Sequence, residues 1–536
     1  MMHTSLLSGG ADANSSRLTT VSRGRFGDAF GVSSRRVSRL ALLRACRASP
    51  LIVCAVGERS YNSHKGRGGA PRVPSPSRST ELNATSVAKL LNARISRCSS
   101  GEELLSLVEE HATSFDFIHA STALVCLAHL EPVETWKHDF RMQLLIARAG
   151  ELLEQMGGQA LANSLWACSK LGVTPAWLPR WVELSRSKLA KMNSLDLSNI
   201  LYSMALLKEV PDALWMDAFW IASKETMAEF QPQHFSNIIW AAATLGCSPP
   251  ADWLAHFCDV SKEKVTTFTS QNFSNTIWAF AELRHRPTVA WLQPFFDISL
   301  ARLPDFNAQA LSSTLWALAE LGVVPFPEWM DAWATRVAAV FNTFSSQGAV
   351  NILWALTVLQ MQDSDVFRSL LLQALQLLTP DSDGRELCSL YDVLQFAAAE
   401  KVVGLPTPDA ILFDSAKKAW DLDIAETAQQ HASVDHIAVM SALKELGVAH
   451  EQEHFCLQSG RSIDIALLDR RIAIEVDGPS HYLNTRRRTG KTLLRNRVLT
   501  GAGWRVVSIP FFEWRALKSM SAQNGYIQQK LSSTGR

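Results

Sequence analysis

The chain has 536 residues, of which 47% are hydrophobic and 19% are charged, so it can form two or three domains with buried cores and is not disordered throughout. Its formal net charge is only +1 because two basic end segments offset an acidic middle segment. Residues 1–80 carry 13 Lys and Arg against 3 Asp and Glu, residues 81–459 carry 25 against 43, and residues 460–536 carry 14 against 5. The nine cysteines include no Cys-x-x-Cys pair, which argues against a zinc site. No apolar run is long enough for a membrane span, so no membrane insertion is expected.

The first 80 residues are rich in Arg and Ser and poor in acidic residues. This composition predicts an organellar transit peptide over residues 1–80. The alternative is a basic tail that binds nucleic acid without sequence preference. The organelle could be the mitochondrion or the chloroplast, and we favour the mitochondrial matrix slightly over the chloroplast stroma.

An internal repeat of 38 residues occupies the middle of the chain. Two aromatic series mark it, one made of Tyr202, Trp240, Trp278, Trp316 and Trp354, the other of Trp177, Trp215, Trp253, Trp291 and Trp329. Such a period is typical of solenoids built from helix-turn-helix units. We therefore expect an α-solenoid over residues 81–400, with clear repeats at about 150–375.

Helix boundary signals recur in the same register. Residues that cap helix N-termini stand nine positions before the aromatic of the first series, at Asn193, Thr269, Asn307 and Ser345, and Pro232 takes the next position in its own unit. Glycines that end helices stand six positions after Trp240 and Trp316, at Gly246 and Gly322, and Gly172 stands six positions after Trp166, an aromatic 36 residues before Tyr202. Each unit should contain two helices, the second of about four turns.

Amide side chains collect on the face of this second helix that lies opposite its leucine-rich stripe. They are Asn163, Asn199, Asn237, Asn275 and Asn351, together with Gln233, Gln271, Gln309 and Gln347. One interpretation is a structural hydrogen-bond ladder, with the Trp residues filling space against the next unit, and for the Trp residues we favour this packing role. The other is a concave groove in which the amides pair with the base edges of single-stranded RNA.

The units that begin with Gln271-Asn-Phe-Ser-Asn-Thr-Ile-Trp-Ala and Gln309-Ala-Leu-Ser-Ser-Thr-Leu-Trp-Ala resemble octotricopeptide repeats, the 38-residue helical repeats of organellar RNA-binding proteins. The resemblance implies a right-handed α-solenoid that binds RNA. Tetratricopeptide repeats are shorter, so the period argues against them.

After a segment expected to be a linker, residues 401–431, a second domain is predicted over residues 432–536. Its first element should be an amphipathic helix that Gly447 ends. Period-2 alternation then predicts two strands joined near Asp469 and Arg470, and a third strand at 505–510. The basic stretch between them should begin as a loop and become helical from Lys491.

Three parts of this domain resemble the RAP domain: Asp464-Ile-Ala, then Ala473-Ile-Glu-Val-Asp-Gly-Pro-Ser-His-Tyr, then Gly503-Trp-Arg-Val-Val-Ser-Ile-Pro with Glu513-Trp514. The resemblance implies a small α/β module with a fold similar to restriction endonucleases. It also implies a relation to organellar RNA-processing factors, among them the FAST kinase-like proteins.

Three carboxylates are the candidate catalytic and metal-binding residues: Asp464, Glu475 and Asp477. Glu475 and Asp477 are two apart on one strand and should share a face, where Mg²⁺ could bind. Nucleases of this fold usually carry Glu-x-Lys, and Asp477 takes the lysine's place, so we favour a role in organising a loop or orienting Arg side chains. His481 is expected to bind RNA or to pack, rather than to act as a general base.

Electrostatic contact with RNA is expected from the basic stretch of the second domain. Its residues are Arg486, Arg487, Arg488, Lys491, Arg495 and Arg497.

The expected function is organellar RNA binding in the processing, stabilisation or translation of mRNA or rRNA, with other RNA-processing proteins as further partners. No cofactor is expected for that function. Two alternatives stay open. One is a metal-dependent endoribonuclease acting through the second domain with Mg²⁺. The other is a protein-binding solenoid scaffold, since phosphate binding normally needs a basic surface and the solenoid is acidic.

Overall fold

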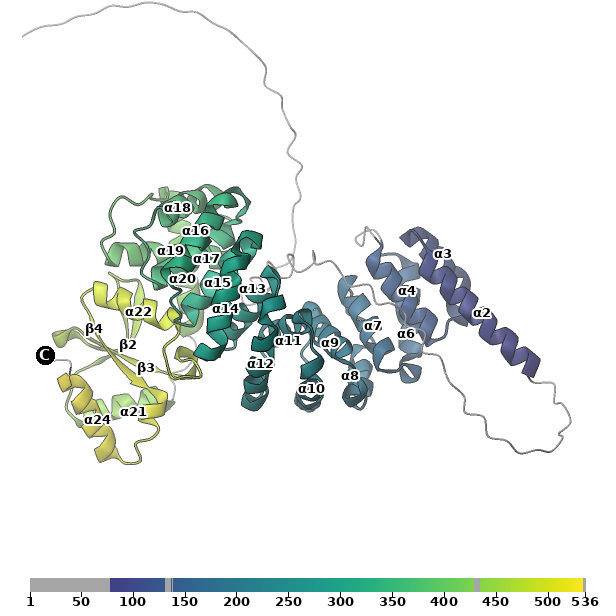
Figure 1. Ribbon diagram of the computed structural model, residues 1–536. Helices are drawn as coiled ribbons and strands as arrows, with labels where there is room; N and C mark the ends of the chain where they lie inside the picture. Colours follow the sequence, from purple (N-terminus) through teal and green to yellow (C-terminus); the bar gives the residue numbers. More distant parts are fainter. Residues whose placement is uncertain (1–77, 131–135, 137, 429–433, 534–536) are drawn as a thin grey trace, which may run out of the picture.

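The computed structural model describes residues 78–130, 136, 138–428 and 434–533. The predicted transit peptide lies outside the described residues except for its last three positions. Helices α2 to α20 follow one another as a long array, and a small mixed domain at the C-terminal end packs against the last helices of that array (Figure 1). No helix in these ranges has the length and apolar character needed to cross a bilayer.

The helices of the array form two layers. In chain order they are α2 (Arg78–Arg97), α3 (Gly101–His111), α4 (Phe117–His129), α6 (Phe140–Glu151), α7 (Gly158–Lys170), α8 (Leu178–Arg186), α9 (Ser194–Leu207), α10 (Ala213–Glu225), α11 (Pro232–Leu245), α12 (Ala251–Lys264), α13 (Ser270–Glu282), α14 (Val289–Arg302), α15 (Ala308–Glu320), α16 (Pro327–Ala339), α17 (Ser346–Val358), α18 (Asp365–Leu377), α19 (Gly384–Ala399) and α20 (Ala410–Ala428). The second helices of the repeats, α7, α9, α11, α13, α15 and α17, lie side by side in one layer. The first helices, α8, α10, α12, α14 and α16, form the other layer.

The predicted helix boundaries of the repeats are confirmed. The side chains of Asn193, Thr269, Asn307 and Ser345 each accept a hydrogen bond from the backbone N–H three residues later, and Pro232 is the first residue of α11. Gly172, Gly246 and Gly322 adopt positive φ angles of 68°, 71° and 59° at the helix ends, a conformation that costs glycine little.

A ladder of indole–hydroxyl hydrogen bonds joins neighbouring first helices, and sequence reasoning missed its serine half. The indole Nε1 of Trp215 donates to Ser185 Oγ at 2.9 Å, and the same bond recurs at Trp253–Ser223 (3.0 Å), Trp291–Ser261 (2.9 Å) and Trp329–Ser299 (3.0 Å). These four tryptophans are fully buried. The tryptophans of this series therefore pack between the first helices, and the serines carry the 38-residue period as well.

The first aromatic series packs within the layer of second helices. The rings of Tyr202 and Trp240 lie 5.4 Å apart, and those of Trp316 and Trp354 lie 6.1 Å apart, measured between centroids. Each pair joins the second helices of two successive units. The packing interpretation was made for this series and is confirmed, but these rings pack against the second helix of the neighbouring unit, where the first helix of the next unit was expected.

The predicted linker at 401–431 is wrong for most of its length, because residues 410–428 form helix α20. Leu412 and Ala416 are buried, and the ring of Trp420 packs 5.9 Å from that of Tyr391 on α19. These three residues of α20 are spaced by four, as one face of a helix requires. This apolar stripe was the signal available in the sequence.

The C-terminal domain is a four-stranded sheet between two layers of helix. Its elements are α21 (Val434–Glu445), β1 (Glu451–Cys456), β2 (Arg461–Leu467), β3 (Ile472–Asp477), α22 (Gly490–Gly501), β4 (Arg505–Pro510), α23 (Phe511–Trp514) and α24 (Met520–Ser533). The strand order is β1-β2-β3-β4, antiparallel except for the parallel pair β3 and β4. The predicted helix, three strands and helical basic segment are confirmed, whereas β1 and α24 were not predicted.

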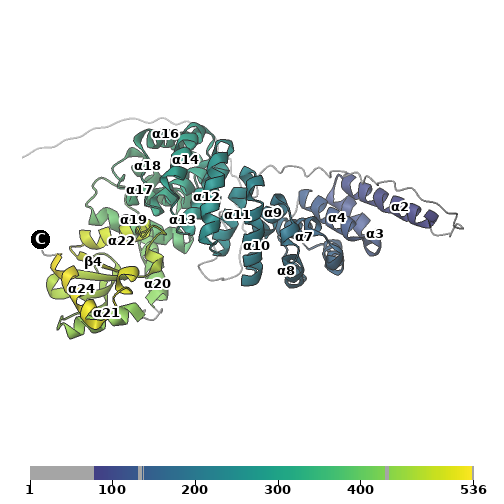
Figure 2. The same ribbon diagram turned by 60° about the horizontal axis from the view of Figure 1, so that its bottom comes forward.

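The two faces of this sheet have different partners. Ile465, Ile474 and Ile509 pack with α21 and α24 on one face, and Ala473 packs with Leu499 of α22 on the other. Helix α22 in turn contacts α15, α17 and α19 of the solenoid, and Figure 2 shows it between the sheet and those helices. The predicted fold class, a mainly α protein with an α-solenoid followed by a small α/β domain, is confirmed.

A cationic pocket between the solenoid and the C-terminal domain

Asn484 forms hydrogen bonds between the C-terminal domain and the solenoid. Asn484 lies in the loop between β3 and α22, and its backbone N–H donates to the carbonyl of Arg284 at 2.9 Å. Its side-chain oxygen accepts from the backbone N–H of Arg286 at 2.8 Å, and its side-chain nitrogen lies 3.1 Å from His285 Nδ1. The loop is therefore held to the turn that follows α13.

The start of α22 rests directly on α15. A Cβ atom added at Gly490 would lie 2.6 Å from the carbonyl oxygen of Ala319, so only glycine permits this approach. The next residue, Lys491, donates its backbone N–H to Glu320 Oε2 at 2.9 Å. Burial raises the pKa of Glu320 from 4.5 to about 7, which the bond from Lys491 only partly offsets. Glu320 therefore lies at the domain interface and not in open solvent.

A third contact uses one of the predicted RNA-binding residues. Arg497 donates from Nη1 to the carbonyls of Thr357 and Val358, at 3.3 and 2.9 Å, where α17 ends. The negative end of the helix dipole and these carbonyls satisfy the guanidinium. Arg497 therefore serves the domain contact.

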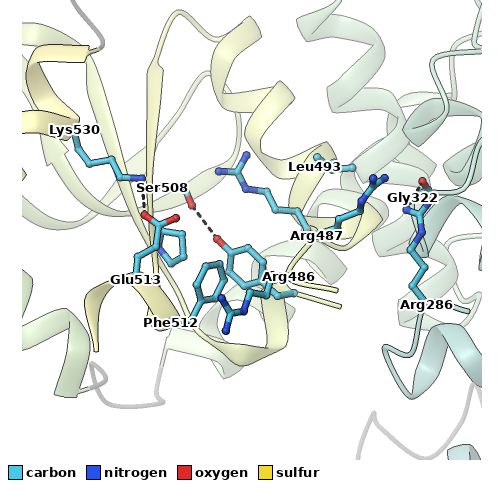
Figure 3. Close-up of a pocket in the computed structure, with 12 residues that line it drawn as sticks. Arg286, Gly322, Arg486, Arg487, Leu493, Ser508, Phe512, Glu513 and Lys530 are labelled. Atoms are coloured by element: carbon cyan, nitrogen blue, oxygen red, sulfur yellow. Dashed lines mark hydrogen bonds and ion pairs between the residues drawn. The ribbon is translucent and has the colours of Figure 1, made fainter. Parts of the chain in front are cut away.

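A pocket of about 520 Å³ lies where the two domains meet (Figure 3). In the figure, Arg286 and Gly322 stand on the solenoid side, and Arg486 and Phe512 stand on the other. The residues that line the pocket are Arg286, Gly322, Tyr482, Arg486, Arg487, Arg488, Leu493, Ser508, Pro510, Phe512, Glu513 and Lys530. Four arginines and one lysine thus face a single carboxylate.

The arginine on the solenoid side is held rigidly. Arg286 donates from Nη1 to the carbonyls of Leu321 and Gly322, at 3.0 and 2.9 Å, just beyond the end of α15. Burial, followed by the charge of Arg487, lowers the pKa of this guanidinium. Because the guanidinium groups of Arg286 and Arg487 repel each other, an anion that binds between them would stabilise both.

The opposite side of the pocket is a tight loop. The N–H of Leu483 donates to the carbonyl of Arg487 at 2.8 Å, and the N–H of Arg486 donates to the carbonyl of Leu483 at 2.9 Å. Arg486 has a φ of 58°, a left-handed conformation that is strained for a residue other than glycine. Its guanidinium lies 5.0 Å from the ring centroid of Phe512. Neither Arg486 nor Arg487 forms an ion pair with any described residue.

The single carboxylate of the pocket is already neutralised. Glu513 pairs with Lys530 Nζ at 3.0 Å and accepts a hydrogen bond from Tyr526 Oη at 2.6 Å. Burial would raise the pKa of Glu513, but these two bonds outweigh burial and lower it. The arginines of the pocket therefore carry an uncompensated positive charge.

Two of the predicted catalytic carboxylates bind an arginine. Glu475 is fully buried and forms an ion pair with Arg495, whose Nη2 also lies 3.4 Å from Asp464 Oδ1 and donates to the carbonyl of Ser462 at 3.1 Å. Burial raises the pKa of Glu475 well above its ordinary value, against the opposing charge of Arg495. The expectation that the carboxylates orient an Arg side chain fits this geometry, which places Arg495, a predicted RNA-binding residue, against Asp464 and Glu475.

Asp477 belongs to a different set of bonds. It projects from the same face of β3 as Glu475, as predicted, but it accepts hydrogen bonds from Ser508 and, at 3.1 Å, from Tyr482 Oη. His481 Nδ1 lies 3.6 Å from Asp477 Oδ1, and burial lowers the pKa of this histidine. The part of the chain that the structure describes contains no group of three or more His, Cys, Asp or Glu side chains placed to hold a metal ion. A guanidinium stands where Mg²⁺ would need to lie, so these carboxylates do not fit a magnesium centre.

Two known family models match parts of this chain. Residues 474–530 match the family model described as the RAP domain. The chain carries a RAP domain at its C-terminus. Residues 179–324, within the solenoid, match a second model, described as the N-terminal domain of the Tbc2 translation factor. The RAP match includes most of the pocket residues, and the second match includes Arg286 and Gly322.

Two curated relatives match a short part of this chain. A rice protein named "RAP domain-containing protein, chloroplastic" is 33% identical over 94 residues, which is 16% of this chain and 15% of that protein. A human protein named "FAST kinase domain-containing protein 3, mitochondrial" is 37% identical over 84 residues, 16% of this chain and 12% of that protein. The chain thus matches less than a sixth of either relative.

The amides of the solenoid are less exposed than the helix wheel implied. Asn237 and Asn275 are buried, and the side chain of Asn237 accepts a hydrogen bond from Gln233 of its own helix at 2.6 Å. Gln347 donates to Asn351 in the same way at 2.8 Å. The remaining predicted amides are half-buried: Asn163, Asn199, Gln271 and Gln309. An amide that does join two units is Asn272, which was not predicted and which donates to Ser236 Oγ at 2.9 Å.

Proposed function

We propose that this protein binds single-stranded RNA in a mitochondrion or chloroplast and acts in the processing, stabilisation or translation of organellar transcripts. The observation that carries the proposal is the cationic pocket that the RAP domain completes by docking on the solenoid. Four arginines there face one neutralised carboxylate, and a cluster of guanidinium groups with no ion-pair partner among the described residues favours an anionic ligand. Relatives that are named chloroplastic and mitochondrial support the organellar setting.

In this proposal the two domains have different tasks. The RAP end supplies the phosphate contacts, since the solenoid is acidic over most of its length. The partly exposed edge of the second helices supplies base selection, as in octotricopeptide repeats, through Gln271, Gln309 and the other half-buried amides. The similarity of residues 179–324 to a translation factor supports this assignment of the solenoid.

In this proposal the RAP domain does not cleave RNA. Arg495 holds Asp464 and Glu475, and Ser508 and Tyr482 hold Asp477, so none of the three carboxylates is left to bind a metal or activate a water. The RAP domain in this proposal is a binding module.

The experiment that tests the proposal is crosslinking of the full-length protein to RNA in isolated organelles, followed by sequencing of the recovered RNA. Recovery of a small set of organellar transcripts is the expected result. A matched protein with Arg486, Arg487 and Arg488 changed to Gln should recover much less of the same transcripts. If the wild-type protein recovered no more RNA than this variant, or recovered only copurifying proteins, the protein-binding scaffold would replace the proposal.

A further inference from the structure

We infer that the cationic pocket binds the phosphorylated end of an RNA strand, a terminal phosphomonoester with its attached nucleotide, in preference to an internal phosphodiester. This inference rests on the proposed function and names the part of the RNA that enters the pocket. Three observations carry it: the amount of uncompensated charge, the arrangement of the donors on both sides, and the stacked pair of Arg486 and Phe512.

The charge of the pocket exceeds what one internal phosphate can neutralise. Lys530 is matched by Glu513, which leaves the guanidinium groups of Arg286, Arg486, Arg487 and Arg488. An internal phosphodiester carries one negative charge, whereas a phosphomonoester carries about 1.5 to 2 charges at pH 7 and offers three strong acceptor oxygens. Neighbouring guanidinium groups repel one another more strongly as water is removed, so the ligand of higher charge gains more from entering.

The donors approach from two directions. Arg286 belongs to the solenoid and is fixed by two backbone carbonyls, while Arg487 belongs to the RAP loop and is exposed (Figure 3). The contacts of Asn484 hold the loop at a fixed position against the turn that carries Arg286. Guanidinium groups bind phosphate oxygens through pairs of N–H donors. A terminal phosphate has enough free oxygens to be bound from both sides at once.

The third observation concerns the base. The guanidinium of Arg486 lies over the ring of Phe512, 5.0 Å from its centroid. Bases of single-stranded RNA stack on aromatic rings and on the planes of arginine side chains. The free face of this guanidinium can therefore receive the terminal base. A volume of about 520 Å³ lies within the range of pockets that hold one small ligand.

A free mononucleotide has the same chemistry as a phosphorylated RNA end, and a 5′ phosphate has the same chemistry as a 3′ phosphate. The test therefore uses the full-length protein with one RNA sequence in four forms: 5′-hydroxyl with 3′-hydroxyl, 5′-phosphate, 3′-phosphate, and a closed circle. AMP serves as the competitor. The pocket variant is Arg487→Gln, because this side chain is exposed and makes no ion pair that folding needs. The matched control is Arg470→Gln, an exposed arginine of the RAP domain outside the pocket.

The expected result is that one phosphorylated linear RNA binds about tenfold or more tightly than the 5′-hydroxyl form and the circle, since a charged hydrogen bond has about this effect. Arg487→Gln should reduce the preference to near one, and Arg470→Gln should keep it. Equal binding of all four RNAs by the wild-type protein would overturn the inference while leaving the proposed function in place. Binding of AMP as tight as that of the phosphorylated RNA would also overturn it, because the ligand would then be a free nucleotide. If no form of the RNA bound, the proposed function itself would fail.

Discussion

The side-chain oxygen of Asn484 accepts a hydrogen bond from the backbone N–H of Arg286, 2.8 Å away, although the two residues are 198 positions apart in the chain. One residue is in the RAP loop and the other follows helix α13 of the solenoid. Arg286 lines the cationic pocket on the solenoid side, and the loop of Asn484 supplies the other three arginines. The pocket therefore exists only while the two domains are docked.

Replacing Asn484 by Ala should loosen the loop without unfolding either domain. Two side-chain contacts to Arg286 and His285 are lost, each worth about 0.5 to 1.5 kcal/mol. Hydrogen exchange of residues 483–488 should become faster, and RNA affinity should fall. Asn342→Ala, at an exposed turn of the solenoid, is the matched control and should change neither quantity. Unchanged exchange in Asn484→Ala would show that the loop does not need this contact.

Arg495→Ala should destabilise the RAP domain by about 3 to 5 kcal/mol, because it leaves the buried carboxylate of Glu475 without its partner. Urea unfolding measures this loss, with Arg470→Ala as an exposed control. An Arg495→Ala protein that unfolded like the wild type but bound RNA less tightly would restore Arg495 to the RNA-binding surface.

Domain docking should weaken as the pH rises from about 4.5 to about 7. Burial raises the pKa of Glu320 in the folded protein from 4.5 to about 7, so the contribution of this group to stability is fully present below pH 4.5 and is lost as the pH rises through 7. Glu320→Gln removes the titration and should flatten this part of the stability curve. The measurement is the urea midpoint at several pH values, with Glu263→Gln, an exposed carboxylate of α12, as the control. Identical curves for wild type and Glu320→Gln would contradict the role of this group.

Ser261→Ala should destabilise the solenoid by about 1 to 3 kcal/mol, since it leaves the buried indole N–H of Trp291 without an acceptor. Thermal unfolding measures the effect. Ser187→Ala, an exposed serine whose hydroxyl bonds only to its own helix, is the control and should cost little. Equal melting temperatures for the two variants would mean that the ladder adds no stability.

The sequence predicted local structure well because each boundary of a repeat is set by a residue at that boundary. Asn193 and Thr269 cap their helices, and Gly246 ends one, through bonds within a few residues. The exposed edge strand β1 escaped prediction because its first four residues are polar or charged, and only Phe455 and Cys456 at its end are apolar. Helix α20 was missed because its charged residues masked the stripe of Leu412, Ala416 and Trp420.

The site was only partly predictable, because the spacing of residues does not reveal docking between domains. Arg486, Arg487 and Arg488 line the pocket, as a basic RNA-binding stretch should. Arg495 and Arg497 belong to the same stretch in the sequence, but the helix turns them toward Glu475 and toward the end of α17. Arg286 comes from a repeat, and nothing near it in the sequence indicates that the RAP loop lies opposite.

The central claim is that the arginines of the RAP loop supply the electrostatic attraction for RNA. The most direct test measures the affinity of the full-length protein for single-stranded RNA over a range of salt concentrations, for the wild type and for the protein with Arg486, Arg487 and Arg488 changed to Gln. Each phosphate contact contributes about 0.7 to the slope of log affinity against log salt, so the slope should fall by about 2, and affinity should fall for every RNA sequence alike. An unchanged slope and affinity in the triple variant would contradict the account.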